Sequence, residues 1–188
     1  MKQARTLTDK QIKIVYAHCS TRRHAARDRA IVAFSFMAGL RAKEIAALTI
    51  DNVCKEDGKI REEFVLSKEQ TKGRKARRVF LSQKLRQELE LYFREVKLRK
   101  GCFALFQSQK GKAFSANTMC QLFLNIYSHC GIEGASSHSG RRSLLTKLAS
   151  KGVGVRVLAE IAGHSSITIT QRYLDANDEQ MRAAVELI

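Results

Sequence analysis

Two residue types that suit phosphate chemistry lie close together in the segment HSGRR, which begins at His138. His138 and Arg141 are three residues apart, so they share a face if a helix has begun there. The free N–H groups of a helix N-terminus attract an anion, and a guanidinium adds paired donors that match two phosphate oxygens. The plainer alternative is a surface arginine beside a hydrogen-bonded histidine. The pair is a candidate phosphate site.

Tyr173 follows the segment GHSSITITQR, nine residues after His164. A tyrosine at a helix end usually belongs to the core, with its hydroxyl hydrogen-bonded. A phenol acts as a nucleophile only if a neighbour accepts its proton and cations hold the phosphate it attacks. The residues that could meet those needs are His138, His164, Arg41 and Arg141.

Arg41 lies in GLRAKE, directly after a glycine that ends an almost wholly apolar segment. A charge so close to buried material needs a carboxylate or a ligand beside it. Glu44, about one helical turn further on, is one candidate partner, and a bound phosphate is the other. The sequence leaves both open.

Mostly helical elements must position these residues. Apolar side chains recur at helical spacing and predict helices after Thr8, over 25–38 and 42–48, and around 85–96, 119–127, 144–148 and 157–161. Between 53 and 82 the pattern changes to β-branched and aromatic residues around Gly73, which predicts an antiparallel hairpin. The expected fold class is α+β, mainly α-helical, with one small antiparallel sheet.

Composition limits the class of protein. The 188 residues are enough for one domain with its own core, and 34 Lys and Arg against 18 Asp and Glu give a net charge of +16. Such an excess indicates a polyanionic partner, nucleic acid before an anionic membrane surface. The five cysteines are odd in number and lack a CxxC pair, which favours reduced thiols. No signal segment or span of about 20 apolar residues is found, so we expect a cytoplasmic protein without membrane contact.

Taken together, these residues resemble the catalytic domain of the tyrosine recombinase (phage integrase) family, from about Leu7 to the C-terminus. The family's motifs are matched in order: GLRxxE at Arg41, a hairpin lysine at Lys72, His-x-x-Arg at His138 and Arg141, GH at His164, and the nucleophile at Tyr173. Lys75 is a rival to Lys72, since the hairpin could shift register. Gly140, Arg142 and Phe80 replace the leucine, histidine and proline of many relatives.

The resemblance implies a site-specific recombinase in which Tyr173 attacks a DNA phosphate and becomes joined to the 3′ phosphate. Arg41 and Arg141 would neutralise the phosphate, Lys72 would protonate the leaving 5′ oxygen, and His138 and His164 would assist. It also implies no metal, cofactor or ATP. The implied partners are double-stranded DNA, further protomers in a tetramer, and accessory DNA-bending proteins. We expect further DNA contacts from Lys68, Arg74, Lys75, Arg77 and Arg142.

The resemblance also bears on domain organisation. Many relatives carry a separate core-binding domain, which the residues before Leu7 cannot form, so 1–188 is expected to be a single catalytic domain similar to short recombinases that invert fimbrial promoters. An apolar stripe in residues 178–188 predicts a C-terminal helix. That helix packs either on a neighbouring protomer or back on its own domain.

Two other functions remain open from the residues alone. The segment VRVLAEIAGHSSITITQRYL also resembles a helix-turn-helix, which would suit a DNA-binding regulator without enzymatic activity. That reading explains the charge but not the ordered positions of Arg41, Lys72 and His138. A membrane-surface protein is the weaker alternative, because no segment joins a basic face to a bulky apolar one.

Overall fold

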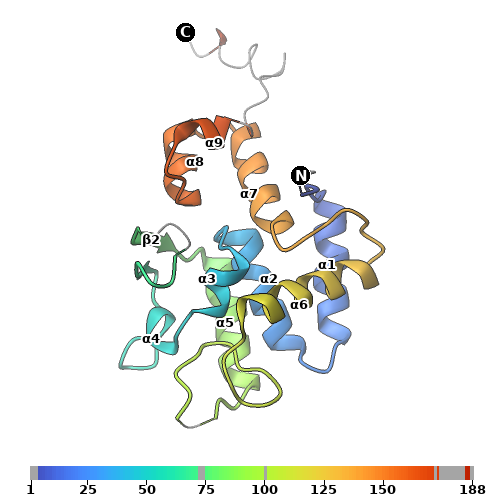
Figure 1. Ribbon diagram of the computed structural model, residues 1–188, viewed down its shortest axis with the longest axis vertical. Coiled ribbons are helices and arrows are strands. Elements are labelled where there is room, and N and C mark those ends of the chain that lie inside the picture. Colours follow the sequence, from blue (N-terminus) through green and yellow to red (C-terminus); the bar gives the residue numbers. More distant parts are fainter. Residues whose placement is uncertain (1–3, 72–74, 100, 172, 174–184, 187–188) are drawn as a thin grey trace.

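The computed structural model of the protein describes residues 4–71, 75–99, 101–171, 173 and 185–186. In chain order the described elements are α1 (Asp9–Thr21), α2 (Ala25–Met37), α3 (Ala42–Ala46), α4 (Ile50–Val53), β1 (Glu63–Leu66), β2 (Arg77–Phe80), α5 (Gln83–Glu95), α6 (Ala116–His129), α7 (Ser139–Ser150), α8 (Val155–Ala162) and α9 (Ile167–Gln171). Helices make up most of this part of the chain, and β1 and β2 form a small antiparallel sheet (Figure 1). The expected α+β class is confirmed.

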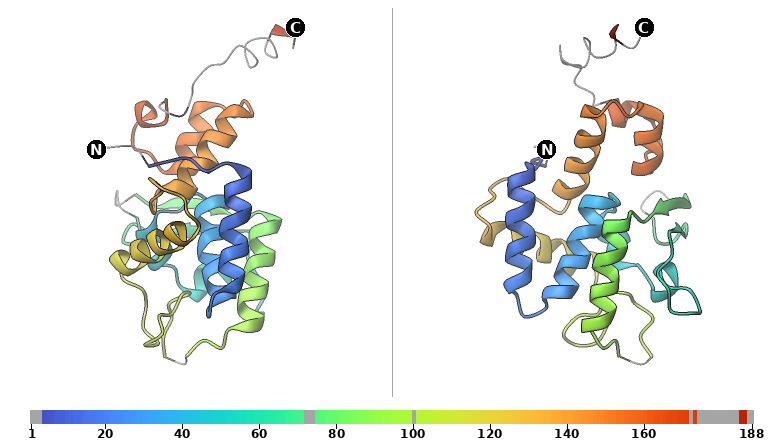
Figure 2. Two further views of the ribbon diagram at one scale, coloured as in Figure 1. Left: turned by 90° about the vertical axis from the view of Figure 1, so that its right-hand side faces the viewer. Right: turned by 180° about the vertical axis from the view of Figure 1, so that it is seen from behind.

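Helix α2 forms the centre of the main core. Its sequence AARDRAIVAFSFM is apolar beyond the first turn, and ten of its thirteen residues are buried. Helices α1 and α5 flank it, and α6 packs across α1 and α3 (Figure 2). Helix α1 begins where the sequence predicts, because Thr8 and Gln11 form a reciprocal capping box. The glycine after α2, Gly39, has φ +64°, and it turns the chain toward α3.

The sheet pairs β1 and β2 with Phe64 opposite Val79 and Leu66 opposite Arg77. Side chains alternate between two faces, so Phe64, Leu66 and Val79 are buried while Phe80 is 62% exposed. Arg77 therefore points inward, on the same face as Val79. The strands have four residues each, shorter than the β-like segments in the sequence.

Helices α7, α8 and α9 enclose a second, smaller core of Leu145, Ala149, Leu158 and Ala162. They lie together at one end of the molecule, above α2, α3 and α5 in the view of Figure 1. The first turn of α7 joins them to the main core. A Cβ at Gly140 would lie 2.3 Å from the Ser35 hydroxyl, so only glycine allows α7 to approach α2 this closely.

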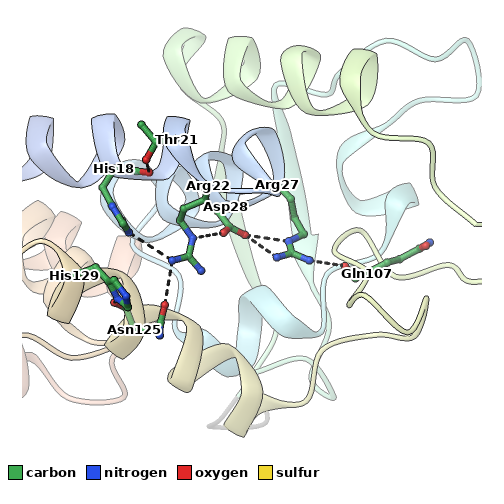
Figure 3. Close-up of polar contacts among 8 residues, drawn as sticks. All are labelled: His18, Thr21, Arg22, Arg27, Asp28, Gln107, Asn125 and His129. Carbon is green, nitrogen blue, oxygen red and sulfur yellow. Dashed lines mark hydrogen bonds and ion pairs between the residues drawn. The ribbon is translucent and has the colours of Figure 1, made fainter.

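An ion-pair network around the buried Asp28 joins α1, α2 and α6 (Figure 3). Asp28, 1% exposed, accepts from Arg22 Nε at 2.7 Å and from Arg27 Nη2 at 2.9 Å. Arg22 also donates to Asn125 Oδ1 at 3.0 Å, and Arg27 donates to the Gln107 carbonyl at 3.3 Å. The network fixes the turn between α1 and α2 against α6 and the loop that precedes it.

Two His–Cys pairs of adjacent residues, one in α1 and one at the end of α6, lie beside this network. The rings of His18 and His129 stack with centroids 5.6 Å apart, while the thiols of Cys19 and Cys130 are free. Burial, and then the nearby Arg22, lowers the pKa of His18. Within the described ranges no group of three or more His, Cys, Asp or Glu residues is arranged to hold a metal ion.

One short helix, α4, was not expected, because its four residues are too few for an apolar period to emerge. Helix α9, after Gly163, corresponds to the second short helix of the segment that resembles a helix-turn-helix. None of the described helices combines the length and hydropathy needed to cross a membrane. Apart from residues 185–186, the tail helix expected over 178–188 lies outside the described residues.

Candidate active site

Glu44 lies at the centre of a charged cluster beneath the hairpin. It has no exposed surface, and its Oε1 accepts from Arg41 Nη1 at 2.9 Å. Its Oε2 accepts from Arg77 Nη2 at 2.7 Å and from the Arg41 backbone N–H at 2.8 Å. Burial by itself would raise the pKa of Glu44, but Arg77 and Arg41 outweigh it and lower the pKa. Glu44 is therefore a carboxylate at neutral pH.

This contact answers part of the question that the sequence left open for Arg41. The arginine begins α3, and its backbone and side chain both bind Glu44. The Arg41 side chain is still 20% exposed. Pairing with Glu44 therefore orients the guanidinium without enclosing it, and an anion can still reach it.

Arg141 occupies the first turn of α7 and is only 4% exposed. Its Nη1 donates to the Gly39 carbonyl at 2.7 Å, and its Nη2 donates to the carbonyl of Ala162 at the end of α8. Burial and then the charge of Arg41 lower the pKa of Arg141 to about 9, which leaves it protonated at neutral pH. The side chain thus fastens the second core to the turn that precedes Arg41.

Charge is not balanced in this cluster. Arg41, Arg77 and Arg141 carry three positive charges against one negative charge on Glu44, so the sum is +2. Arg141 in particular is held by carbonyl oxygens, and no ion pair to it is found among the described residues. Burying uncompensated charge is costly, so the cluster favours a bound anion such as a phosphate diester.

His164 follows the left-handed turn at Gly163 that ends α8. Its Nδ1 lies 2.8 Å from the hydroxyl of Thr170, a residue with no exposed surface. Burial, then Arg141 and Arg41, lowers the pKa of His164 to about 4. The imidazole is neutral at physiological pH, and if the Thr170 hydroxyl donates to Nδ1, Nε2 carries the hydrogen that can be donated to a ligand.

Tyr173 lies beside this histidine. The two rings are nearly parallel, at an interplanar angle of 15°, with centroids 6.2 Å apart. Tyr173 is half-buried against the second core, and its backbone N–H donates to the Thr170 carbonyl at 3.0 Å. The phenol also acts on the pKa of Arg141, in the direction opposite to burial. The fold thus brings Arg41, Arg141, His164 and Tyr173 into one neighbourhood.

Two other expected catalytic residues are placed less fully. His138 is exposed at the N-cap of α7, one turn before Arg141. Lys72 lies outside the described residues, as does Arg74. The rival lysine, Lys75, is exposed two residues before β2.

The expected DNA contacts divide into exposed and inward-facing side chains. Lys68 and Lys75 are exposed. Arg77 does not match a surface role, because strand alternation turns it inward, where its side chain is 8% exposed and bound to Glu44. Arg142 is half-buried and donates to the Ala4 carbonyl at 2.8 Å.

The contacts of two residues in this neighbourhood could not be found from the sequence. Thr170 sits in the segment ITIT, where nothing separates it from its neighbours until the fold places it on His164. Arg77 is one of six basic residues between 68 and 78. Alternation along the strand was the available signal for Arg77, but it required the register of the hairpin to be known.

The chain is similar to known proteins of one family. The family model described as "Phage integrase family" matches residues 5–180. Tyrosine recombinase XerD of Neisseria meningitidis serogroup B is 30% identical over 185 residues, which cover 96% of this chain and 61% of that protein. Tyrosine recombinase XerC of Caldanaerobacter subterraneus is 31% identical over 165 residues, 85% of this chain and 44% of that protein. The chain therefore spans at most about three fifths of these relatives.

Solved structures show the same fold at lower identity. The Tn1549 transposon integrase in complex with a circular intermediate DNA superposes with a TM-score of 0.81, at 18% identity, over 100% of this chain and 67% of that one.

Proposed function

Because the chain belongs to the phage integrase family, we propose that it carries the catalytic centre of a site-specific tyrosine recombinase acting on double-stranded DNA. The observation that supports this most strongly is the juxtaposition of Tyr173 and His164 beside arginines with an excess of positive charge. A phenol next to a phosphate-binding cluster is what attack on a phosphodiester requires.

In this reaction the Tyr173 oxygen attacks the scissile phosphorus and forms a new P–O bond. The bond to the 5′ oxygen breaks, and that oxygen leaves with the electron pair and takes up a proton. The product is a 3′-phosphotyrosyl link and a free 5′ hydroxyl. Attack of a 5′ hydroxyl on the link reverses these steps and rejoins a strand, so no external energy source is consumed.

The other residues take the roles that the family resemblance implies. Arg41 and Arg141 stabilise the charge that develops on the non-bridging oxygens. Neutral His164 donates a hydrogen bond from Nε2 to the same phosphate. His138, exposed at the N-cap of α7, assists proton transfer from the tyrosine. Lys72, or Lys75 in another register of the hairpin, supplies the proton to the leaving oxygen.

Replacing Tyr173 with phenylalanine tests the nucleophile. The variant should bind a nicked DNA site as the wild type does, but it should form no protease-sensitive covalent adduct on a denaturing gel. A wild-type adduct that persists in Tyr173→Phe would refute the assignment. Binding without any adduct in the wild type, on sites that bind specifically, would favour the helix-turn-helix regulator instead.

Assembly on DNA is part of the same proposal. Four protomers would synapse two sites, with the 178–188 segment of one protomer packed on the next and accessory DNA-bending proteins as further partners. Val185 in that segment is 71% exposed. Deleting 178–188 should leave strand cleavage intact and abolish junction formation. Unchanged junction formation would contradict packing of the segment on a neighbouring protomer.

The net charge of +16 makes DNA affinity steeply salt-dependent, because each neutralised phosphate releases counterions.

A cytoplasmic location agrees with DNA as the substrate. The regulator alternative is less favoured, since it gives no role to the buried arginine cluster beside Tyr173. We also propose that residues 1–188 form one catalytic domain.

A further inference from the structure

Arg77 differs from the basic residues around it. Lys68, Lys75 and Arg78 are exposed, whereas the Arg77 side chain is 8% exposed. Arg78, its neighbour on β2, points to the opposite face and is 63% exposed. Strand alternation thus removes one arginine from the basic surface and places it inside.

The buried guanidinium joins three elements. Arg77 lies on β2, its Nη2 donates to Glu44 of α3 at 2.7 Å, and its Nη1 donates to the Ile161 carbonyl of α8 at 2.9 Å. The third guanidinium nitrogen, Nε, is buried without an acceptor among the described residues. The two terminal nitrogens therefore define the position of the side chain.

Steric contact with α8 also constrains the position of the Arg77 side chain. Gly163, which ends α8 at φ +57°, lies directly against Arg77. A Cβ at Gly163 would come within 2.5 Å of Arg77 Cδ and 2.9 Å of its Nε. The glycine is required both for the left-handed turn and for the space that the arginine fills.

The end of α8 is where this contact matters. The last carbonyls of a helix lack partners within it, and cations near them are favourable. Arg77 donates to the Ile161 carbonyl, and Arg141 donates to the Ala162 carbonyl. His164 lies two residues after Ala162. The His164 N–H returns to the Ala159 carbonyl at 3.0 Å, which closes the turn.

We propose that Arg77 is a positioning residue: by bridging Glu44 and the end of α8, it holds His164 in register with Arg41 and Arg141. This role rests on the recombinase function proposed above, but it differs from the DNA contact expected of Arg77 from sequence. A phosphate contact would contribute to affinity and to its salt dependence. A positioning residue instead contributes to the rate once DNA is bound.

The test measures covalent adduct formation in single turnover on nicked DNA, together with DNA affinity at several salt concentrations. Arg77→Met should lower the rate at saturating DNA by about ten- to a hundredfold, while the dissociation constant and its salt slope stay within about twofold. Arg78→Ala, on the same strand but facing outward, should keep the saturated rate. Arg77→Lys should recover part of the rate, since an ammonium can reach one acceptor but not both.

A second readout separates positioning from general damage. The methionine variant leaves Glu44 with Arg41 as its ion-pair partner, so it will be less stable. A thermal melt identifies the temperatures at which this variant is folded, and its saturated rate should stay low at those temperatures. Titration of His164 by NMR should show a raised pKa in Arg77→Met, because a positive charge has been removed, and no change in Arg78→Ala.

Weaker DNA binding and a smaller salt slope in Arg77→Met, with an unchanged saturated rate, would overturn the positioning role and restore the DNA contact. Absence of any wild-type adduct would instead refute the proposed function. In that case amide hydrogen exchange at Gly163 and His164 still tests whether Arg77 holds the turn at the end of α8. Unchanged exchange in Arg77→Met would refute this role.

Discussion

Neutralising Glu44 is the most direct perturbation of the charged cluster. In Glu44→Gln the side chain keeps its shape, but the negative charge that binds Arg41 and Arg77 is lost. The amide nitrogen would also face an arginine donor. Breaking a buried ion pair by removing one partner costs about 3–5 kcal/mol. With one acceptor oxygen retained, we expect about 3 kcal/mol, or roughly 6–12 °C in melting temperature for a chain of this size.

Urea unfolding at pH 7 measures this cost, with Glu63→Gln as the matched control. Glu63 is 46% exposed and lies 3.8 Å from Arg78, so its loss should cost no more than about 0.5 kcal/mol. A destabilisation by Glu44→Gln below about 1 kcal/mol would refute the view that Glu44 compensates the buried arginines.

The stability that Glu44 contributes should depend on pH. The pKa of Glu44 in the folded protein lies below its ordinary value of 4.5, so the unfolded chain takes up the proton first as the pH falls. The stability that the carboxylate contributes is present above pH 4.5 and is lost below it. The difference between wild type and Glu44→Gln should therefore shrink as the pH is lowered through this range. A difference that stays constant would contradict the lowered pKa.

Three further predictions concern other parts of the structure. Asp28→Asn should cost about 3 kcal/mol in urea unfolding, because it leaves the buried Arg27 and the partly buried Arg22 without a carboxylate, whereas Asp57→Asn at an exposed site should cost almost nothing. Thr170→Val should slow adduct formation without weakening DNA binding, and nitrogen shifts should show a mixture of His164 tautomers; a single unchanged tautomer would exclude this role. His164 should stay neutral in NMR titrations down to about pH 5, and a midpoint near 6.5 would contradict its burial beside the arginines.

The sequence by itself predicted those features that depend on neighbouring residues or on the order of motifs along the chain. Apolar periods and caps predicted the long helices, as the capping box at Thr8 shows. The change of pattern between 53 and 82 predicted the hairpin, which the pairing of β1 and β2 confirms. The order and spacing of the motifs from Arg41 to Tyr173 indicated the family, which the match over residues 5–180 confirms. Each of these inferences depends on a few neighbouring residues or on their order along the chain.

Contacts between distant segments were decided only by the tertiary structure. Arg77 and Arg78 are adjacent and chemically identical, yet one is buried on Glu44 and the other is exposed, because the strand register assigns them to opposite faces. Thr170 acquires a role only because the turn at Gly163 brings His164 back onto it. Burial and neighbouring charges set the state of each ionisable group, and both depend on which segments meet after folding.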